Sequence, residues 1–318
     1  MRPNCSIAYL VLAHADPAQL QRLLKTLEGD EAAFYIHIDG KADLAAFKRA
    51  TEGISSVYFC EPRVKVTWGA FSVVEATLRL LEAALLHPGA MSCNRFVLLS
   101  GADYPIASNQ EISRFFARHP NREFIRGFAI RDAGRPQLWR IRGRHFRELA
   151  PRYSWLRPPL FAVESGLRLF PRRLPSKTVF VCGSQWWALT RACAQFCLNF
   201  ARTDRDLVRL FKTTFAPDEM FFHTIVHNSQ FAREADVPEP FVDDVVRSGS
   251  LRFYANLHYL PNNWICTRED ARAALNGSPR QLFARKFSSD RSYSAMDLID
   301  ESLDYRARHD RAPRRAHS

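Results

Sequence analysis

The sequence predicts an α/β fold in which helices cover a mostly parallel sheet. Within the first 120 residues, four short apolar runs of strand length alternate with four segments of helical periodicity. The apolar runs are continuous, which is typical of strands buried on both faces of a parallel sheet. With 318 residues and 47% hydrophobic content, the chain is long enough for one large domain or two small ones.

The first two strand–helix pairs are clear in the sequence. Residues 6–14 form an apolar run ending in His14, and Pro17–Leu27 then carries leucines at helical spacing. A second run over 33–39 ends in Asp39 and leads into a helix at Leu44–Ala50.

The next two pairs repeat this order. A short strand at Val57–Phe59 leads through residues 66–69 into a helix over 71–86 with one apolar face. The fourth strand, Arg95–Ser100, is closed by the turn 101–105 and followed by a helix at Asn109–Arg118.

Polar side chains follow three of these strands, namely His14, Asp39 and Asp103. In open parallel sheets, ligands bind beyond the carboxyl ends of the strands, so these residues are candidate ligand contacts. A loop histidine without a special role and two acidic turn formers are the alternatives. The chain has no GxGxxG and no GxxxxGK[ST] motif, so neither a dinucleotide fold nor a P-loop is indicated.

From residue 126 to 176 the periodicity fails and Arg, Pro and aromatic residues dominate. This composition predicts a long ordered excursion over one end of the sheet. Arginines beside Trp and Tyr suit stacking on sugar rings or bases, or binding of an anion. A solvated basic loop on a membrane surface is the alternative.

Regular structure returns with two short strands within 178–190, followed by helices over 191–200 and 204–211. Adjacent Trp186 and Trp187 in an extended segment face opposite ways, so one is expected in the core while the other faces a cleft. Packing of both in the core is equally compatible. Short strands are expected within 251–260 and 264–266, and a capping-box-like start at Thr267 opens a helix that Gly277 ends.

The segment 215–224 contains two adjacent carboxylates, Asp218 and Glu219, directly after Pro217. Acidic side chains after a proline are the ordinary signal of a helix start. A carboxylate held at this position is also suited to remove a proton from a substrate. The sequence leaves both interpretations open at this point.

The net charge of +12 favours anionic partners such as nucleic acid, an anionic membrane face or a sugar-nucleotide diphosphate. Arginines cluster in 126–173 and 306–315. The seven cysteines show no zinc-ligand spacing and are expected as reduced thiols in a core. With neither a signal peptide nor a membrane span in the sequence, we expect a cytoplasmic protein, with peripheral contact at the inner membrane face through its basic segments left open.

Seven short motifs in order resemble the core 2/I-branching β-1,6-N-acetylglucosaminyltransferases, a family that also includes the peptide O-xylosyltransferases. The resemblance extends from Ile7 to Phe287. The motifs are AYLVLAH ending at His14, IHID at Asp39, VTWG at Gly69, LLSGADYP at Pro105, GSQWW at Trp187, PDE at Glu219 and LFARKF at Phe287.

The resemblance implies one GT-A-like, Rossmann-type α/β domain over residues 1–290, with a helical basic tail at 291–318. Residues 1–120 would form the nucleotide-binding half, and 121–290 the acceptor and catalytic half. It also implies an inverting transferase that uses a UDP-sugar donor and needs no metal and no other cofactor. The donor sugar would be GlcNAc or xylose, and two motifs look nearer the xylosyl branch.

The resemblance assigns roles residue by residue. Glu219 matches the general base, and Lys286 matches the lysine that neutralises the diphosphate. A second family arginine falls near Asn262 or Asn263, where no basic residue stands, so Arg252, Arg268 or Arg285 is left as its replacement. The remaining implied contacts are His14 and Asp39 for the nucleotide, Trp68 and Asp103 for the donor sugar or its loop, and Trp139, Arg140, Arg142, Trp186 and Trp187 for the acceptor.

A bacterial-type cell-surface polysaccharide or a lipid-linked glycan is the favoured acceptor class, with a protein hydroxyl as a further option. A metal-dependent transferase would normally show Asp-x-Asp after a central strand, whereas residues 100–103 offer only Asp103. The alternatives are an inactive relative that acts as a carbohydrate-binding subunit, and a basic nucleic-acid binder. Carboxylates at the strand ends would repel phosphate and count against nucleic acid.

Overall fold

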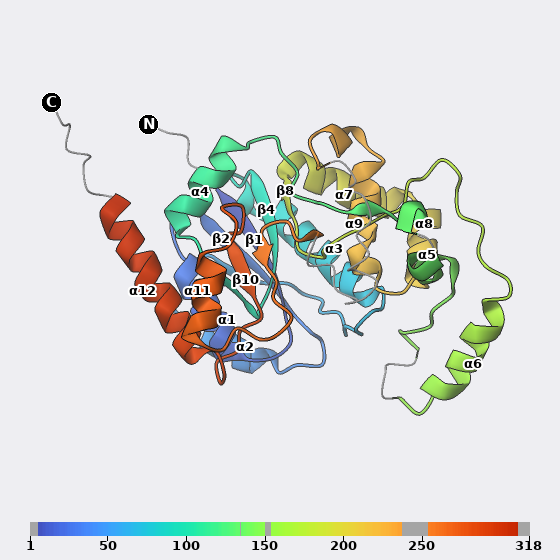
Figure 1. Cartoon of the computed structure of the whole chain (residues 1–318), viewed down its shortest axis with the longest axis horizontal. Coiled ribbons are helices and arrows are strands. Elements are labelled where there is room, and N and C mark those ends of the chain that lie inside the picture. Colours follow the sequence, from blue (N-terminus) through green and yellow to red (C-terminus); the bar gives the residue numbers. More distant parts are fainter. Residues whose placement is uncertain (1–5, 134, 150–153, 237–253, 311–318) are drawn as a thin grey trace.

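A five-stranded sheet forms the centre of the computed structural model, which describes residues 6–133, 135–149, 154–236 and 254–310. The strand order is β3 (Val57–Phe59), β2 (Ala32–Ile38), β1 (Ile7–Ala13), β4 (Arg95–Ser100) and β8 (Ala188–Thr190) (Figure 1). The first four strands are parallel, and β8 runs antiparallel to β4. The predicted mostly parallel α/β fold is therefore confirmed.

Alternation along β1 explains why the sheet is covered on both faces. Ile7, Tyr9 and Val11 pack with one set of helices, and Ala8 and Leu10 pack with the other, as the period of two in a strand requires. The first set is α1 (Pro17–Leu27), α2 (Leu44–Ala50) and α4 (Asn109–Arg118). The second is α3 (Ser72–Leu86) and α7 (Arg191–Thr203).

Two smaller sheets extend this body. β5 (Asp103–Pro105) follows β4 directly and pairs with β10 (Phe283–Arg285), which also pairs with β9 (His258–Tyr259). β6 (Phe128–Ala129) pairs with β7 (Val181–Cys182). The C-terminal part of the chain thus returns to the end of the central sheet at which ligands are expected.

The remaining described elements connect these sheets. The helices are α5 (Arg135–Arg142), α6 (Arg157–Leu167), α8 (Arg205–Lys212), α9 (Phe221–His227), α11 (Arg268–Leu275) and α12 (Tyr293–Asp310). Single 3-10 turns are η1 (Pro88–Ala90), η2 (Ile130–Ala133), η3 (Pro217–Glu219) and η4 (Gln230–Arg233). The capping box expected at Thr267 is present at the start of α11.

Helix α12, in the segment expected as a basic tail, is docked on the body. Met296 and Ile299 are buried in a cluster with Tyr104. Arg22 of α1 lies 2.6 Å from Asp297 and 2.7 Å from Asp300. This part of the tail is therefore an integrated helix as far as the structure describes it.

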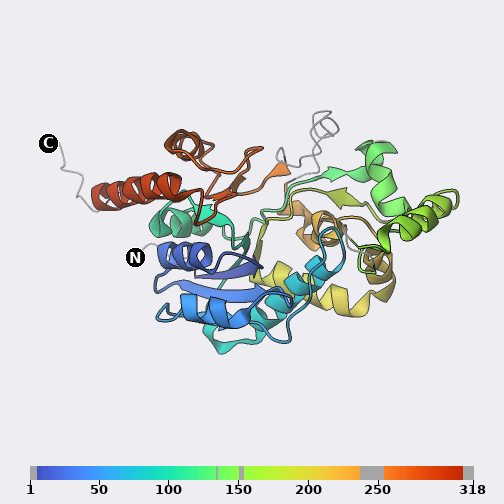
Figure 2. The same cartoon turned by 90° about the horizontal axis from the view of Figure 1, so that it is seen from below.

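The excursion predicted over 126–176 contains β6, η2, α5 and α6. Helix α5 lies against the body, whereas α6 projects from one end of the molecule (Figures 1 and 2). The six cysteines in the described residues are free thiols, and five of them are buried, as predicted. In the same part of the chain, no helix combines the length and apolar character needed to cross a bilayer.

Candidate active site

The turns after β1, β2 and β4 lie side by side at one edge of the central sheet. Ala13 is the register partner of Ile38, and Leu12 is that of Ser100. The backbone N–H of Asp39 donates to the Ala13 carbonyl at 2.9 Å. A Cβ on Gly101 would stand only 2.9 Å from the Cβ of Ala13, so a side chain at this position would have to displace the β1 turn.

Asp39 is buried at this edge and holds a neighbouring loop. Its Oδ1 accepts hydrogen bonds from the backbone N–H groups of Lys41 at 2.9 Å and Val66 at 3.2 Å. The Val66 loop leads directly to Trp68. His14 follows β1 with an exposed side chain. The structure therefore places His14 and Asp39 at the predicted edge.

Asp103 is fully buried at the centre of a polar cluster. It accepts hydrogen bonds from Arg285 Nη1 at 2.8 Å, His258 Nε2 at 3.1 Å and the Ser100 N–H at 2.8 Å. The Arg285 guanidinium also lies 4.6 Å from the ring centroid of Trp186. Burial alone would raise the pKa of Asp103, but the charge of Arg285 and the His258 hydrogen bond outweigh it and hold the pKa below its usual value.

Lys286 follows this cluster and is positioned by its backbone. Its carbonyl accepts from Ile265 N–H at 3.0 Å, and the next N–H, that of Phe287, donates to the Ala102 carbonyl at 2.8 Å. Ser289 then donates from both its N–H and its hydroxyl to Asp16, at 2.7 Å each. Because Asp16 lies in the turn that contains His14, Lys286 lies at the same sheet edge as the strand-end residues.

The Lys286 side chain is exposed, and it forms no ion pair or hydrogen bond with any of the described residues. Partial burial of its amine and the positive charge of Arg285 lower its pKa, and Asp103 partly opposes this. A cation in this position is available to an anionic ligand.

Glu219 ends the 3-10 turn η3, which the left-handed Ala216 (φ 47°) introduces. A helix start is one of the two interpretations that the sequence leaves open for this segment; the structure has this single turn, followed by α9. The backbone of Glu219 accepts a hydrogen bond from Gly183 N–H at 2.9 Å. Its carboxylate is 31% exposed and forms an ion pair with Arg140 of α5. The carboxylate is thus accessible to solvent while its Oε2 is paired with the buried guanidinium of Arg140.

Arg140 is buried, and its guanidinium contacts both this loop and β7. Its Nη2 also donates to the Ala216 carbonyl at 3.1 Å, and Nη1 lies 3.3 Å from the Cys182 sulfur. The adjacent Asp218 has a buried Oδ1 that accepts no hydrogen bond among the described residues. Burial and the negative charge of Glu219 raise the pKa of Asp218 to about 7. Near neutral pH, Glu219 is therefore accompanied by an Asp218 carboxyl that is partly protonated.

An exposed aromatic surface lies beside Glu219. The ring of Trp139 stacks on Phe215 at 5.1 Å between centroids, and Trp68 meets Phe215 edge-on at 5.8 Å. Trp139 is 41% exposed and Trp68 68% exposed. The loops are joined by a 3.0 Å hydrogen bond from Ala216 N–H to the Gly69 carbonyl. We call Trp68, Trp139 and Phe215 the aromatic surface.

One short segment connects Glu219 to the Asp103 cluster. The N–H of Gly183 donates to the Glu219 carbonyl, and the ring of Trp186 lies against the Arg285 guanidinium. Three residues span at most about 10 Å. The backbone of Glu219 and the guanidinium of Arg285, one of the candidates for the second diphosphate cation, thus contact the two ends of one segment.

The other predicted residues have distinct environments. Trp186 and Trp187 are both buried, at 8% and 1% exposed, in the same core cluster, so the alternative in which both pack in the core holds. Trp187 packs on Phe222, and Trp186 lies against Arg285. Arg142 is exposed on α5. Arg268 pairs with Glu301 of α12 at 2.9 Å. Arg252 lies outside the described residues.

Sequence reasoning missed two contributors. His258 is buried against Asp103, and Phe215 supports both tryptophans of the aromatic surface. His258 is on a two-residue strand that has no pattern of its own, so it carries no sequence signal. Phe215 stood next to the PDE motif, but its role depends on rings from two other segments.

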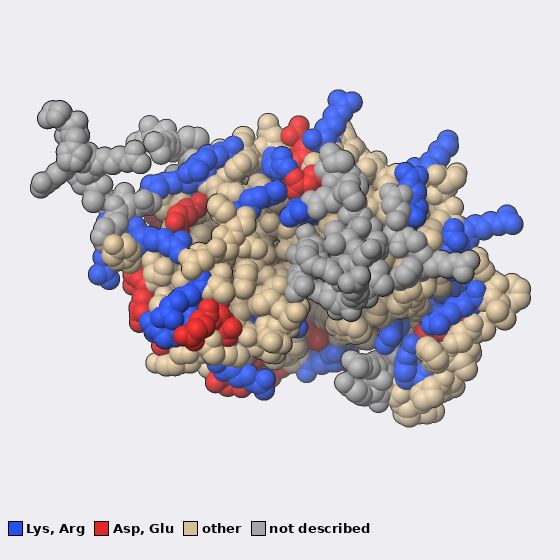
Figure 3. Space-filling model, viewed as in Figure 1, with Lys and Arg blue, Asp and Glu red and all other residues tan. Residues whose placement is uncertain are grey.

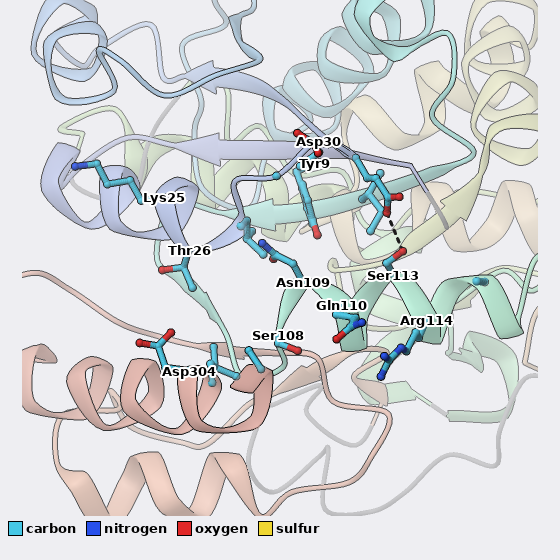
Figure 4. A pocket seen from close by; sticks show the side chains of 18 of the residues that line it. Tyr9, Lys25, Thr26, Asp30, Ser108, Asn109, Gln110, Ser113, Arg114 and Asp304 are labelled. Atoms are coloured by element: carbon cyan, nitrogen blue, oxygen red, sulfur yellow. Dashed lines mark hydrogen bonds between the residues drawn. The ribbon is translucent and has the colours of Figure 1, made fainter. Parts of the chain in front are cut away.

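A groove of about 1440 Å³ lies elsewhere, at the opposite ends of the strands (Figure 4). It is lined by the strand starts Ile7 and Ala32 and by residues of α1, α4 and α12. None of the predicted site residues lines it. Among the described residues, no group of three or more His, Cys, Asp or Glu side chains is arranged to hold a metal ion.

Comparison with known proteins defines the class. The family model of the Core-2/I-Branching enzyme matches residues 7–237. The chain is 31% identical over 317 residues to "Xylosyltransferase 2" of Homo sapiens, covering 95% of this chain and 34% of that protein. It is 28% identical over 249 residues to "Xylosyltransferase" of Ciona intestinalis, covering 76% of this chain and 26% of that protein.

The family model matches most of the chain and therefore shows its family. The chain belongs to the Core-2/I-Branching enzyme family, with the xylosyltransferases among its relatives. It spans about a third of the length of the curated relatives it matches. The crystal structure of mannose-1-phosphate geranyltransferase from Thermus thermophilus aligns with 82% of this chain and 83% of its own at 11% identity, but its TM-score is only 0.29.

Proposed function

We propose that this chain is an inverting glycosyltransferase that moves a sugar from a UDP-sugar to an acceptor hydroxyl. The observation that carries the proposal is the segment 183–186, which contacts the Glu219 backbone at one end and the Arg285 guanidinium at the other. A base and a cation on opposite sides of a reacting carbon are what a single displacement requires.

In this mechanism Glu219 removes the proton of the acceptor hydroxyl. The hydroxyl oxygen attacks the anomeric carbon as the bond from that carbon to the diphosphate oxygen breaks, which inverts the configuration. The electron pair of the broken bond leaves on UDP, where Lys286, with Arg285 beside it, stabilises the developing negative charge. The ion pair with Arg140 holds the Glu219 carboxylate in place for this step.

Fixed cations, rather than a divalent ion, are proposed to receive the diphosphate. The Asp103 carboxylate accepts from Arg285 on one oxygen and from His258 and Ser100 on the other. It therefore has little capacity left to ligate a metal ion. Full activity in excess EDTA is expected, and loss of activity that Mn²⁺ restores would contradict this part of the proposal.

Xylose is favoured over GlcNAc as the transferred sugar because the relatives named above are xylosyltransferases. The aromatic surface beside Glu219 suits the acceptor, since exposed tryptophan rings stack on the apolar faces of sugars. We propose a glycan acceptor, either a cell-surface polysaccharide or a lipid-linked glycan, and retain a protein hydroxyl as the further option.

The deciding experiment combines thermal-shift measurements with detection of released UDP. UDP-xylose, UDP-GlcNAc, UDP-glucose and UDP-galactose are compared with UDP alone. We expect stabilisation by UDP and by one or two UDP-sugars, with slow UDP release from the preferred donor. Stabilisation without any UDP release or transfer would indicate an inactive carbohydrate-binding relative, and no stabilisation by any nucleotide would overturn the proposal.

A further inference from the structure

The segment 154–177, which contains α6, exposes an unusual number of large apolar side chains. We call this segment the arm. Trp155 is 83% exposed, Leu169 79% and Phe170 72%, while Phe161 and Val163 are about half exposed. The arm projects from the body at the end of the molecule that also holds α5 (Figure 1).

The exposed charges of the arm are all positive. It contains five cationic residues and one carboxylate, Glu164. Glu164 is buried, pairs with both Nη atoms of Arg157 at 2.7 Å, and accepts from Phe146 N–H at 2.8 Å. Arg168, Arg173 and Lys177 remain exposed among the apolar side chains. In Figure 3 this end of the molecule shows Lys and Arg amid uncharged surface.

The base of the arm is fixed to the body by hydrogen bonds of Arg172 and Arg144. Arg172 donates to the carbonyls of Leu210 at 2.7 Å and Ile141 at 2.5 Å, and its N–H donates to the Arg142 carbonyl at 3.0 Å. Arg144 Nη1 donates to the Phe170 carbonyl at 3.0 Å. Leu169 and Phe170 are therefore exposed in a segment whose backbone is fixed to the body by hydrogen bonds.

We propose that the arm docks on the surface of an anionic lipid bilayer. Its Trp, Phe, Leu and Val side chains would enter the boundary between headgroups and acyl chains, and Arg168, Arg173 and Lys177 would contact lipid phosphates. An anionic bilayer fits both the exposed apolar side chains and the exposed cations of the arm, because its surface offers an apolar phase together with negative charge. A nucleic acid would match the cations but would leave Val163 and Leu169 in water.

Docking would place the bilayer beside the proposed acceptor site. The guanidinium of Arg168 lies 6.0 Å from the ring of Trp139 in the aromatic surface. An acceptor glycan attached to a membrane lipid would then approach Glu219 from the membrane side. Only this consequence rests on the proposed function, because the docking itself can be measured without catalysis.

The test is flotation of the full chain with vesicles. One set is phosphatidylcholine alone, and the other contains about 30 mol% phosphatidylglycerol. We expect the wild-type chain to float with the anionic vesicles at low salt and to be largely released from them at high salt, with little binding to the neutral set. Absence of binding to anionic vesicles would overturn the proposal.

Two variants separate the two contributions. Trp155→Ser/Leu169→Ser/Phe170→Ser removes apolar side chains that are almost fully exposed, and Arg173→Glu/Lys177→Glu reverses two charges. Each should lower the vesicle partition coefficient by about tenfold or more. Since all five positions are exposed and lie outside the proposed catalytic residues, UDP affinity and transfer to a soluble acceptor should be unchanged.

Matched control variants on other faces complete the design. Leu86→Ser/Met91→Ser/Tyr305→Ser alters apolar residues that are 63–74% exposed, and Lys48→Glu/Arg49→Glu alters two exposed cations of α2. Both controls should bind vesicles like the wild type. Equal losses in arm and control variants would reduce the effect to net charge or general hydrophobicity and would contradict the proposal.

Two further outcomes would assign the arm to another partner. If the apolar variant converts a wild-type dimer into a monomer and the wild type ignores vesicles, the arm is a protein interface. If an oligonucleotide competes fully with anionic vesicles and the apolar variant keeps its binding, the arm is a polyanion site. Failure of UDP-sugar transfer with vesicle binding intact would contradict the proposed function and leave the docking proposal standing.

Discussion

Arg140 donates a hydrogen bond to the Glu219 carboxylate from a buried position, although the two residues are 79 positions apart in the chain. The same guanidinium also binds the Ala216 carbonyl at the start of the Glu219 turn. One cation therefore fixes both the carboxylate and the backbone that carries it. The first two predictions concern the two partners of this pair.

Replacing Glu219 with Gln should lower kcat by about 10²- to 10⁴-fold, because the acceptor hydroxyl loses its base. The affinity for UDP should stay the same, since the proposed contact of the diphosphate is Lys286. Rates with the preferred UDP-sugar and calorimetric UDP binding measure the two quantities. Asp218→Asn is the matched control, because burial and the charge of Glu219 raise the pKa of Asp218 and so favour its protonated form, which Asn resembles. If the Asn variant loses activity and the Gln variant keeps it, the base is Asp218.

Replacing Arg140 with Ala should destabilise the fold by about 2 kcal/mol and reduce kcat. The expected loss is smaller than the value for a fully buried pair, because Glu219 is 31% exposed and water can solvate it. Urea unfolding measures the change in the free energy of unfolding. Arg142→Ala, two residues along α5 and exposed, should leave the stability nearly unchanged. Equal effects of both substitutions would show that the Glu219 pair has no special role.

Replacing Lys286 with Ala should weaken UDP binding by about tenfold or more, because a charged hydrogen bond to the diphosphate is lost. Arg285→Ala should also weaken it, whereas Arg268→Ala should not, since Arg268 is paired with Glu301 on α12. Titration calorimetry with UDP gives all three values. An unchanged affinity in the Lys286 variant would remove this lysine from the donor site.

Replacing Asp103 with Asn should destabilise the protein by about 3–5 kcal/mol, because Arg285 would be left without its carboxylate partner in a buried cluster. The pKa of Asp103 is lowered in the folded protein, so the stability it contributes is present above its unfolded value of about 3.8 and is lost as pH falls through the folded pKa. The difference in the free energy of unfolding between the wild type and the Asp103→Asn variant should therefore become smaller in acid. A gap that stays constant down to pH 2 would contradict the ionised cluster.

The contribution of Asp218 to stability should depend on pH in the opposite direction to that of Asp103. The folded pKa of Asp218, about 7, lies above the unfolded value of 3.8, so the folded state binds the extra proton between these values. Its contribution is complete below pH 3.8 and declines as pH rises to about 7. The melting temperature of the wild type should consequently fall relative to Asp218→Asn over this range. In the Glu219→Gln background the decline should be smaller, since the neighbouring charge is gone.

Much of the fold could be predicted from local pattern. Residues such as Leu20, Leu23 and Leu24 are buried because helical spacing places them on the face against the sheet. β1 is apolar throughout, and β4 is apolar between Arg95 and Ser100, because both faces of the sheet are covered. Residues at strand ends, such as His14 and Asp39, could be located because parallel strands end at one edge. Periodicity and strand direction are both local properties of the sequence.

The contacts between the side chains of the candidate site could not be predicted in this way. The bonds from His258 to Asp103 and from Arg140 to Glu219 join residues 155 and 79 positions apart. No periodicity relates such residues, so only the packing of whole elements brings them together. The role of Phe215 could not be predicted either, because its ring contacts Trp68 and Trp139, which come from two other segments of the chain.

The double hydrogen bond from Ser289 to Asp16 has a consequence for biosynthesis. A chain emerges from the ribosome with its N-terminus first, so the central strands can form while β10 and Lys286 are still unmade. The proposed donor site is completed only when residues 283–289 have been made and Ser289 binds Asp16 in the turn after β1. A nascent chain that ends before β10 would therefore form the central sheet and yet lack Lys286 at the proposed donor site.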